Sequence, residues 1–232
     1  MGENRGRIAV VAALEREVRP LVKRWRAIQG KRGGRTFKFF ENDSIVVVCG
    51  GIGAEAARRA AEAVIADYDP AVICSAGFAG ALTPELQVGS VLSPGCVVNA
   101  SDGSRVSVDG GEGVLVTFGE IASPEQKRKL RESYGAQAVD MEAAAVAQAA
   151  EARGVRFAAI KVISDEVDFE FPSMGRFVTA AGDFSEWRFA VFAALRPWLW
   201  PRVAQLMRNS ARASRLLCEE LGKLATGEAG GE

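Results

Sequence analysis

Histidine is absent from this chain of 232 residues. Its absence excludes the Ser-His-Asp and Cys-His catalytic machineries and every zinc site that has histidine ligands. Proton transfer would therefore fall to carboxylates, lysine, tyrosine, cysteine or water. Any acid–base chemistry has to be sought among those groups.

Cysteine is scarce as well. Cys49, Cys74, Cys96 and Cys218 lie far apart in the sequence and form no CxxC pair. The first two lie inside apolar runs, which predicts buried thiols in a reducing compartment. We therefore expect neither a disulfide nor a metal site, and the sequence implies no cofactor.

The chain also lacks an excess of charge and any long apolar run. Lys and Arg total 29, as do Asp and Glu, whereas a nucleic-acid-binding protein usually carries a basic excess. No apolar run reaches the roughly 20 residues of a membrane-spanning helix. The first residues, MGENRGRIAVV, have no signal-peptide pattern. We expect a cytoplasmic protein with no nucleic-acid partner.

Short β-branched runs alternate with helical patterns along most of the chain. Such runs are typical of strands that are buried on both faces of a parallel sheet. The predicted strands are residues 7–13, 36–40, 44–49, 71–75, 88–98, 113–118 and 155–163, the second and third forming a hairpin. The predicted helices are residues 15–25, 54–68, 124–133 and 141–153, and residues 99–113 are expected to form a loop or surface hairpin.

This alternation predicts an α/β domain with three layers, αβα, around a mixed and mainly parallel sheet. We expect this domain to span residues 1–185. Residues 186–224 form a helical, amphipathic pattern that is broken at Pro197 and Pro201. They are expected to pack on the domain, and residues 225–232 to form a flexible tail.

Two glycine turns and two carboxylates stand where a ligand would be expected in such a fold, at the carboxyl ends of strands. The GGIG turn at 50–53 leads into a helix whose free N–H groups favour anions. It is equally well explained as a tight strand-to-helix turn, and the same holds for Gly77 and Gly80. Asp165 follows an apolar strand, where a partly desolvated carboxyl group can act as an acid. Glu142, in the first turn of a helix, is favoured by the helix dipole alone.

Taken together, these segments carry a resemblance. AALEREV, CGGIG, SAGFAGAL, VDMEAAAVA and VISDEVD follow one another within residues 7–170. In them the sequence resembles the purine/uridine phosphorylase superfamily and, within it, the methylthioadenosine/S-adenosylhomocysteine nucleosidases. The resemblance implies a nucleoside-phosphorylase fold and cleavage of the N-glycosidic bond of an adenine nucleoside.

The resemblance also implies the roles of individual residues. Asp165, helped by Ser164, would protonate N7 of the purine, and Glu17 would activate the attacking water. Glu142 would hold the ribose hydroxyls while Met141 packs on the sugar. These tasks suit carboxylates, because an oxocarbenium-like sugar needs nearby negative charge and the leaving base needs a proton.

The remaining candidates concern the walls of the pocket. Leu14 and Ile52 would line it, and the backbone near Ile121 would contact the adenine edge. Three residues depart from the family pattern, and each affects how securely the base or sugar is assigned. Phe78 replaces a small polar residue of the glycine turn, Glu120 stands at the position of the base-stacking aromatic, for which nearby Phe118 could substitute, and Lys161 replaces an arginine that would contact sugar or phosphate.

Water and phosphate both remain open as the nucleophile. Phosphorolytic members of the family bind phosphate partly through an arginine in the loop after the first strand. Here that loop reads AALEREV, the nucleosidase form, which favours water. A phosphate-dependent purine nucleoside phosphorylase and a methylthioadenosine/S-adenosylhomocysteine nucleosidase are therefore alternatives.

The 5′ group of the substrate is suggested by a deletion and by the C-terminal segment. Between Val98 and Val114 the family has a longer insert that covers the 5′ side of the sugar, so a large apolar group could protrude here. The C-terminal segment mixes Trp, Phe and Leu with arginines, as expected either for helices packed on the domain or for a membrane-interface surface. It is similar to the hopanoid-associated subgroup, which removes adenine from adenosylhopane.

Two further expectations concern partners and function class. Members of the family are commonly dimers or larger, so we expect a homo-oligomer, with peripheral contact at the inner membrane face left open. A hypothesis of another class is a non-catalytic nucleoside-binding protein, which is favoured by the three departures from the family pattern.

Overall fold

The structure, a computed structural model, describes residues 6–170 and 195–226. The strands are β1 (Ile8–Ala12), β2 (Arg26–Arg32), β3 (Arg35–Glu41), β4 (Ile45–Cys49), β5 (Val72–Ala81), β6 (Val91–Leu92), β7 (Cys96–Asn99), β8 (Arg105–Ser107), β9 (Val114–Thr117), β10 (Ala138–Asp140) and β11 (Arg156–Asp165). The helices are α1 (Glu15–Val22), α2 (Ala54–Tyr68), α3 (Pro124–Tyr134), α4 (Ala143–Glu151) and α6 (Trp200–Thr226), with a 3₁₀ turn η2 at Pro197–Leu199.

The strands form one mixed sheet in the order β2-β3-β4-β1-β5-β10-β9-β7-β8, with β11 paired to β5 and β6. At its centre β1 runs parallel to β4 and β5, and β5 runs parallel to β11. Only β10 is antiparallel to β5 there. The prediction of a mixed, mainly parallel sheet is therefore confirmed, as is the hairpin between β3 and β4.

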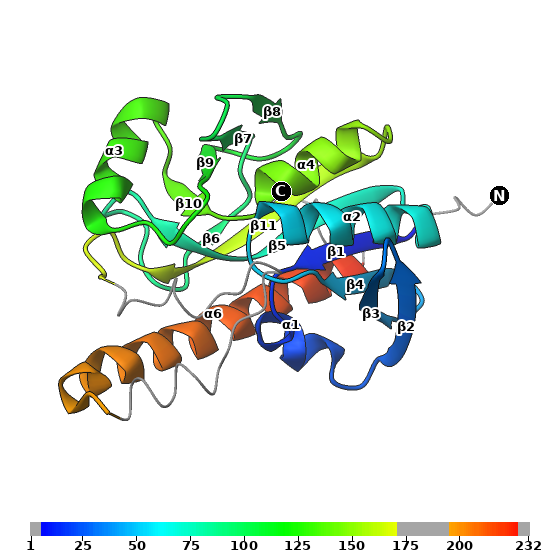
Figure 1. Ribbon diagram of the computed structural model, residues 1–232, viewed down its shortest axis with the longest axis horizontal. Coiled ribbons are helices and arrows are strands. Elements are labelled where there is room, and N and C mark those ends of the chain that lie inside the picture. Colours follow the sequence, from blue (N-terminus) through cyan, green and yellow to red (C-terminus); the bar gives the residue numbers. More distant parts are fainter. Residues whose placement is uncertain (1–5, 171–194, 227–232) are drawn as a thin grey trace.

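Helices cover both faces of the sheet, which confirms the three-layer architecture (Figure 1). The pattern follows from the period of two along a strand, because neighbouring side chains point to opposite faces. Val11 packs in the core beneath α2 and α4, whereas Val10 packs on the other face with Ala213 and Leu217 of α6. The C-terminal helix is thus part of a hydrophobic core and does not merely extend from the domain.

Several predicted boundaries were wrong. The two central strands are longer than expected, since β5 runs through the GFAG segment and β11 through Asp165. Each extension is possible because the two strands pair with each other along their whole length. The predicted strand 88–98 is instead divided into β6 and β7 by Ser93-Pro94-Gly95, since proline cannot donate a ladder hydrogen bond.

Other elements gave no clear sequence signal. Strand β2, RAIQGKR, is a half-exposed edge strand with no apolar run, and β10 has only three residues. Pro201 does not break α6, because it lies in the first helical turn, where proline is tolerated. Residues 186–194 of the predicted C-terminal helix and the tail from 227 onward lie outside the described residues. In the described part of the chain, no helix combines the length and hydrophobicity needed to cross a membrane.

The N-terminus of α4 is anchored by side chains from two neighbouring strands. Asp140 of β10 accepts a hydrogen bond from the backbone N–H of Ala143 through Oδ2, at 2.8 Å. The Thr117 hydroxyl of β9 accepts from the N–H of Ala144 at 2.9 Å and donates to Asp140 Oδ1 at 2.6 Å. Two N–H groups that a helix start leaves unpaired are satisfied in this way, and the position of Glu142, which immediately precedes α4, is fixed.

We predict that replacing Thr117 with valine lowers the free energy of unfolding by about 1–2 kcal/mol, because a buried N–H group and a buried carboxylate each lose a partner. Urea denaturation monitored by circular dichroism measures the difference. Thr117→Ser keeps the hydroxyl group and serves as the control, with a smaller loss. Equal stability of the valine and serine variants would contradict the anchoring role.

Candidate active site

A pocket of about 160 Å³ opens where the carboxyl ends of β1, β5 and β11 meet. In open α/β sheets this edge is where ligands bind. Most of the residues singled out from the sequence line this pocket, namely Leu14, Glu17, Ile52, Gly77, Phe78, Gly80, Ile121, Met141, Glu142, Ser164 and Asp165. They come from six segments of the chain that lie far apart in the sequence.

Glu17 lies in the first turns of α1 and is buried. Burial raises the pKa of its carboxyl group to about 7, although Lys161 nearby lowers it. The backbone beneath it is held by the C-terminal helix, since the Ser214 hydroxyl donates to the carbonyl oxygen of Glu17 at 2.9 Å. A methyl group at Gly77 would lie 3.2 Å from Glu17 Oε2, so the glycine leaves room for this carboxylate.

Glu142 lies across the pocket and is held by two backbone N–H groups. Its Oε1 accepts from Gly53 at 2.8 Å and its Oε2 accepts from Met141 at 3.2 Å. Burial and the charge of Asp140 raise its pKa to about 7, and Lys161 opposes them. The GGIG turn therefore does favour an anion at the start of α2, but that anion is a carboxylate of this chain.

Lys161 is the positive charge between these acids. Its Nζ lies 2.9 Å from Asp140 Oδ2 and 3.0 Å from the Ser75 hydroxyl. Burial lowers its pKa, but the charges of Asp140, Glu142 and Glu17 outweigh this and raise it. Lys161 is not among the residues that line the pocket, and its ammonium group is engaged by Asp140 and Ser75. The contact with sugar or phosphate expected of it stays a prediction.

Asp165 ends β11 at an irregularity in the pairing with β5, where Ile163 pairs with Ala79 and Asp165 with Gly80. Its Oδ1 accepts from the Ser164 hydroxyl at 2.7 Å, and its Oδ2 lies 2.5 Å from Lys127 Nζ. Burial raises the pKa of Asp165 and outweighs the opposing effect of Lys127. This carboxyl group is therefore set apart from the cluster around Lys161 and has a cation of its own.

Glu120, at the position of the base-stacking aromatic, and Phe118, its possible substitute, lie in different pockets. Phe118 does not line the main pocket but a neighbouring one, which shares Met141 with it. The stacking role expected of Phe118 stays a prediction. Glu120 does line the main pocket, and its Oε1 accepts from Gln126 Nε2 at 2.7 Å.

Lys127 and Asp140 were missed by the sequence analysis. Lys127 belongs to a strongly charged helix, which is typical of an exposed one. The signal was its spacing of three and seven residues from Leu130 and Tyr134, because these positions share one face of a helix. Asp140 lies within the VDMEAAAVA segment, two residues before Glu142, and its contacts with α4 and Lys161 depend on tertiary structure.

Comparison with known proteins agrees with this architecture. The sequence profile of the phosphorylase superfamily matches residues 7–113 and 100–186. Aminodeoxyfutalosine nucleosidase of Campylobacter jejuni is 23% identical over 205 residues, which cover 71% of this chain and 90% of that protein.

Solved structures of similar fold include three nucleosidases or hydrolases. A 5′-methylthioadenosine/S-adenosylhomocysteine nucleosidase from Colwellia psychrerythraea in complex with adenine is 22% identical, with a TM-score of 0.63 over 70% of this chain and 84% of that one. The corresponding enzyme of Helicobacter pylori is 18% identical, with a TM-score of 0.69 over 95% and 100%. Futalosine hydrolase of the same organism is also 18% identical, with a TM-score of 0.68 over 96% and 100%.

These solved structures share the fold of this chain. The profile match spans the segments from which the pocket is built, from β1 to the end of β11. The chain belongs to the phosphorylase superfamily.

Proposed function

We propose that this protein is a nucleosidase that hydrolyses the N-glycosidic bond of an adenine nucleoside and releases the base. The observation that carries the proposal is the convergence of Glu17, Glu142 and Asp165 around one pocket. Relatives described as nucleosidases, one of them with adenine bound, support the same reaction.

In this proposal Asp165 is the acid that protonates N7 of the leaving base, with Ser164 orienting its carboxyl group. The environment of Asp165 suits the task, because its buried carboxyl group keeps a proton at higher pH than an exposed one does. Protonation allows the base to leave as a neutral molecule while the C1′–N9 bond breaks.

On the sugar side, Glu142 accepts hydrogen bonds from the ribose hydroxyls and Met141 packs on the ring. Glu17 takes a proton from the water that attacks C1′. Both carboxylates also stabilise the positive charge that develops on the sugar in the transition state. A base with a pKa of about 7 is well matched to proton transfer near neutral pH.

Water is favoured over phosphate as the nucleophile by the acidic side chains of the pocket. An entering phosphate would meet the carboxylates of Glu17 and Glu142 on the sugar side. Arg16 also lines the pocket, but the two buried lysines nearest to it are already paired, Lys161 with Asp140 and Lys127 with Asp165. Repulsion between like charges in a buried site opposes phosphate binding.

This proposal is tested by incubating the protein with adenosine or methylthioadenosine and measuring the adenine released by chromatography. We expect release without phosphate, no acceleration when phosphate is added, and a loss of about 10²–10⁴-fold in Asp165→Asn, which removes the acid. Tight adenine binding without release from any nucleoside would favour the non-catalytic alternative. A requirement for phosphate would establish a phosphorylase instead.

A second prediction concerns Glu17, whose raised pKa costs stability when the group ionises. A carboxyl group with a pKa of 4.5 in the unfolded chain and about 7 in the folded protein loses stability as the pH rises through about 7, by about 3 kcal/mol at most. Glu17→Gln should therefore be more stable than the wild type at about pH 8, with little difference at about pH 4.

The same variant should lose most of its hydrolytic activity, since glutamine cannot accept the proton from water. In the wild type kcat/KM should rise with pH through about 7, as Glu17 and Glu142 become ionised. Denaturation and base release, each measured across the pH range, provide the check. Glu15→Gln, at an exposed neighbouring position, is the control. A Glu17→Gln variant that is less stable at alkaline pH would contradict the assignment.

We further propose that the substrate carries a large apolar 5′ substituent, as in adenosylhopane. A second pocket of about 110 Å³ adjoins the first at Met141, the residue assigned to the sugar. Its walls combine the apolar side chains of Phe118, Ala144 and Ala145 with polar ones, beside the short β7–β8 hairpin. The polar residues are Asn99, Ser101, Thr117 and Gln148. This space could receive an apolar group that continues from the sugar.

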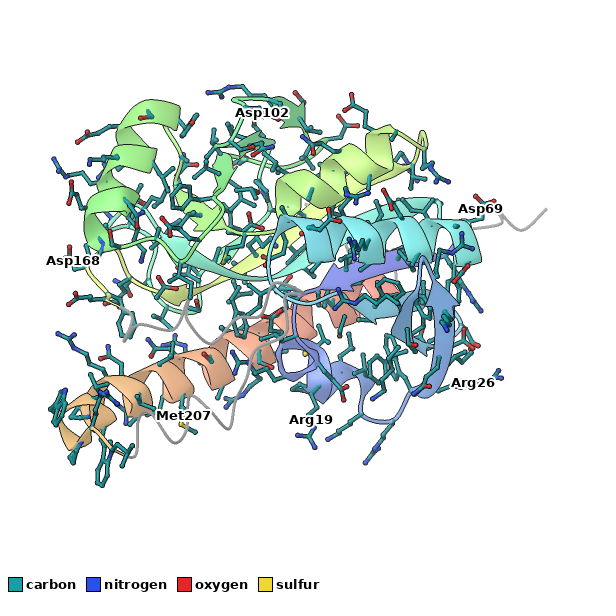
Figure 2. All side chains as sticks on the ribbon, in the orientation of Figure 1. Arg19, Arg26, Asp69, Asp102, Asp168 and Met207 are labelled. Carbon is teal, nitrogen blue, oxygen red and sulfur yellow. The ribbon has the colours of Figure 1, made fainter. Side chains whose placement is uncertain are left out.

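The start of the C-terminal helix supports contact with an anionic membrane surface. Leu195, Trp198, Trp200 and Met207 are exposed there, the first two by 71% each. Residues 195–218 contain five arginines and no Asp or Glu. Figures 1 and 2 show this part of α6, with Met207 labelled, extending beyond the body of the domain. Exposed tryptophan with arginine is the composition of segments that bind anionic lipid interfaces.

A panel of adenine nucleosides with 5′ groups from methylthio to long alkyl tests the substrate class. We expect kcat/KM to increase with the alkyl length.

Vesicle sedimentation tests whether the exposed start of the C-terminal helix binds membranes. We expect the protein to bind anionic but not neutral vesicles. Replacing both Trp198 and Trp200 with serine should abolish vesicle binding without changing hydrolysis of a short soluble substrate. Val91→Ser, which removes an exposed apolar side chain from β6, is the matched control.

Preference for methylthio over long alkyl groups would instead favour a methylthioadenosine/S-adenosylhomocysteine nucleosidase. If the double variant still binds vesicles, the start of the C-terminal helix is not the membrane-binding surface. The dimer expected from the resemblance stays a prediction, for which sedimentation velocity is the measurement.

A further inference from the structure

Lys127 is a buried cation in a helix whose other charged residues are exposed. Only Lys127 and Leu130 are buried in α3, and the Lys127 side chain is 1% exposed. Removing an ammonium group from water is costly unless other groups replace its hydration. A lysine is therefore expected at such a position only where it has specific partners.

Those partners belong to the proposed acid. Lys127 Nζ lies 2.5 Å from Asp165 Oδ2 and donates to the backbone carbonyl of Glu166 at 2.6 Å. The residue opposite is Gly80, where a methyl group would lie 2.7 Å from Asp165 Oδ2 and 3.3 Å from Lys127 Nζ. The glycine thus provides the space in which the two side chains meet.

The helix that carries Lys127 has a well-defined start. Ser123 and Gln126 form reciprocal capping hydrogen bonds, and Pro124 occupies the first helical turn. Gln126 also donates to Glu120, which lines the pocket. Lys127 is therefore tied to the pocket wall through its neighbour as well as through its own side chain.

The ion pair presents a chemical problem for the proposed reaction. An acid that protonates N7 must carry a proton, whereas a carboxyl group beside an ammonium group is favoured in its ionised form. Burial raises the pKa of Asp165 and favours the protonated form, whereas Lys127 lowers it and favours the carboxylate. While the ion pair persists, the acid lacks the proton that N7 needs. Lys127 is the nearest group that holds one, and it lines the same pocket.

We propose that Lys127 is a positioning residue that holds the Asp165 carboxylate and supplies the proton that Asp165 delivers to the base. This inference rests on the proposed function and assigns a role to a residue that the reaction scheme above does not use. It makes Lys127 and Asp165 a single acid that shares one transferable proton.

In the first step, an N–H bond of the Lys127 ammonium group breaks as an O–H bond forms on Asp165. That O–H bond then breaks as N7–H forms, and the electron pair of the C1′–N9 bond passes to the base. Water adds to C1′ and loses its proton to Glu17. After the products leave, Glu17 gives up its proton to water in the emptied pocket and the Lys127 amine takes one up from it, so both groups return to their starting states.

Exclusion of water by the bound base favours the first step. A neutral amine beside a neutral carboxyl group loses less in a dry site than an ion pair does, because desolvation penalises the charged forms. Burial already raises the pKa of Asp165 despite the neighbouring charge. A ligand that covers the pair extends the same effect.

The test compares two substrates and three variants. Adenosine needs a protonated base, whereas 4-nitrophenyl β-D-riboside has a leaving group that departs as a stable anion. We expect Lys127→Met to lower kcat on adenosine by about 10²-fold or more and to leave cleavage of the nitrophenyl riboside within about threefold of the wild type, since no proton is needed there.

The variant Lys127→Arg shows whether the positive charge at this position is sufficient or whether a transferable proton is needed. Arginine keeps the positive charge but does not release a proton in proteins, so this variant should be as slow on adenosine as Lys127→Met. Lys129→Met, at an exposed position of the same helix, is the control and should behave as the wild type. Thermal unfolding of each variant checks that the fold is kept.

The outcomes distinguish the two proposals. A wild-type protein that releases no adenine would remove the proposed function itself. If the wild type is active, full activity of Lys127→Arg on adenosine would overturn proton supply, because charge alone would then suffice. Proton supply would also be overturned if Lys127→Met lowered kcat equally on both substrates, or lowered it on neither.

Discussion

The pocket depends on the buried ammonium group of Lys161. Without this positive charge, Glu17, Asp140 and Glu142 would place three carboxylates in one desolvated space. Lys161 also joins three strands, since its own strand β11 is linked to β5 through Ser75 and to β10 through Asp140. Charge balance and the geometry of the sheet are therefore achieved by the same side chain.

The negative charges of the pocket are only partly balanced by positive ones, and this affects the pKa of the acids. Lys161, with a smaller effect of Arg16 on Glu17, opposes three carboxylates, so burial still raises the pKa of Glu17 and Glu142 to about 7. Asp165 lies outside this cluster and has Lys127 as its own partner. The protein thus separates a sugar-facing group of acids from a single base-facing acid, as the proposed reaction requires.

Much of the fold and of the pocket could be predicted from the sequence because the informative residues follow apolar strands directly. Glu17, Gly77 and Asp165 lie just beyond or within the ends of β1, β5 and β11, which are adjacent and parallel. Local sequence order is then enough to bring them to one edge of the sheet. The segment that contains Glu142 was found through its resemblance to a family.

Other features could not be predicted because they depend on pairs of residues distant in the sequence. Lys127 meets Asp165 across 38 positions, and nothing within α3 other than its spacing indicates which face turns inward. The edge strand β2 has no apolar pattern, because its side chains are mostly exposed. Gly53 looked like part of a ligand-binding turn, yet its N–H is occupied by Glu142.

The hydrogen bond from Ser214 to the carbonyl oxygen of Glu17 has a consequence for how the C-terminal helix can vary among related sequences. On the side of α6 that faces the sheet, each substitution also shifts α1 and the acid it carries. Many described residues on the opposite side are exposed, so we expect them to vary with the surface that the protein encounters. Two rates of sequence change are expected within one helix.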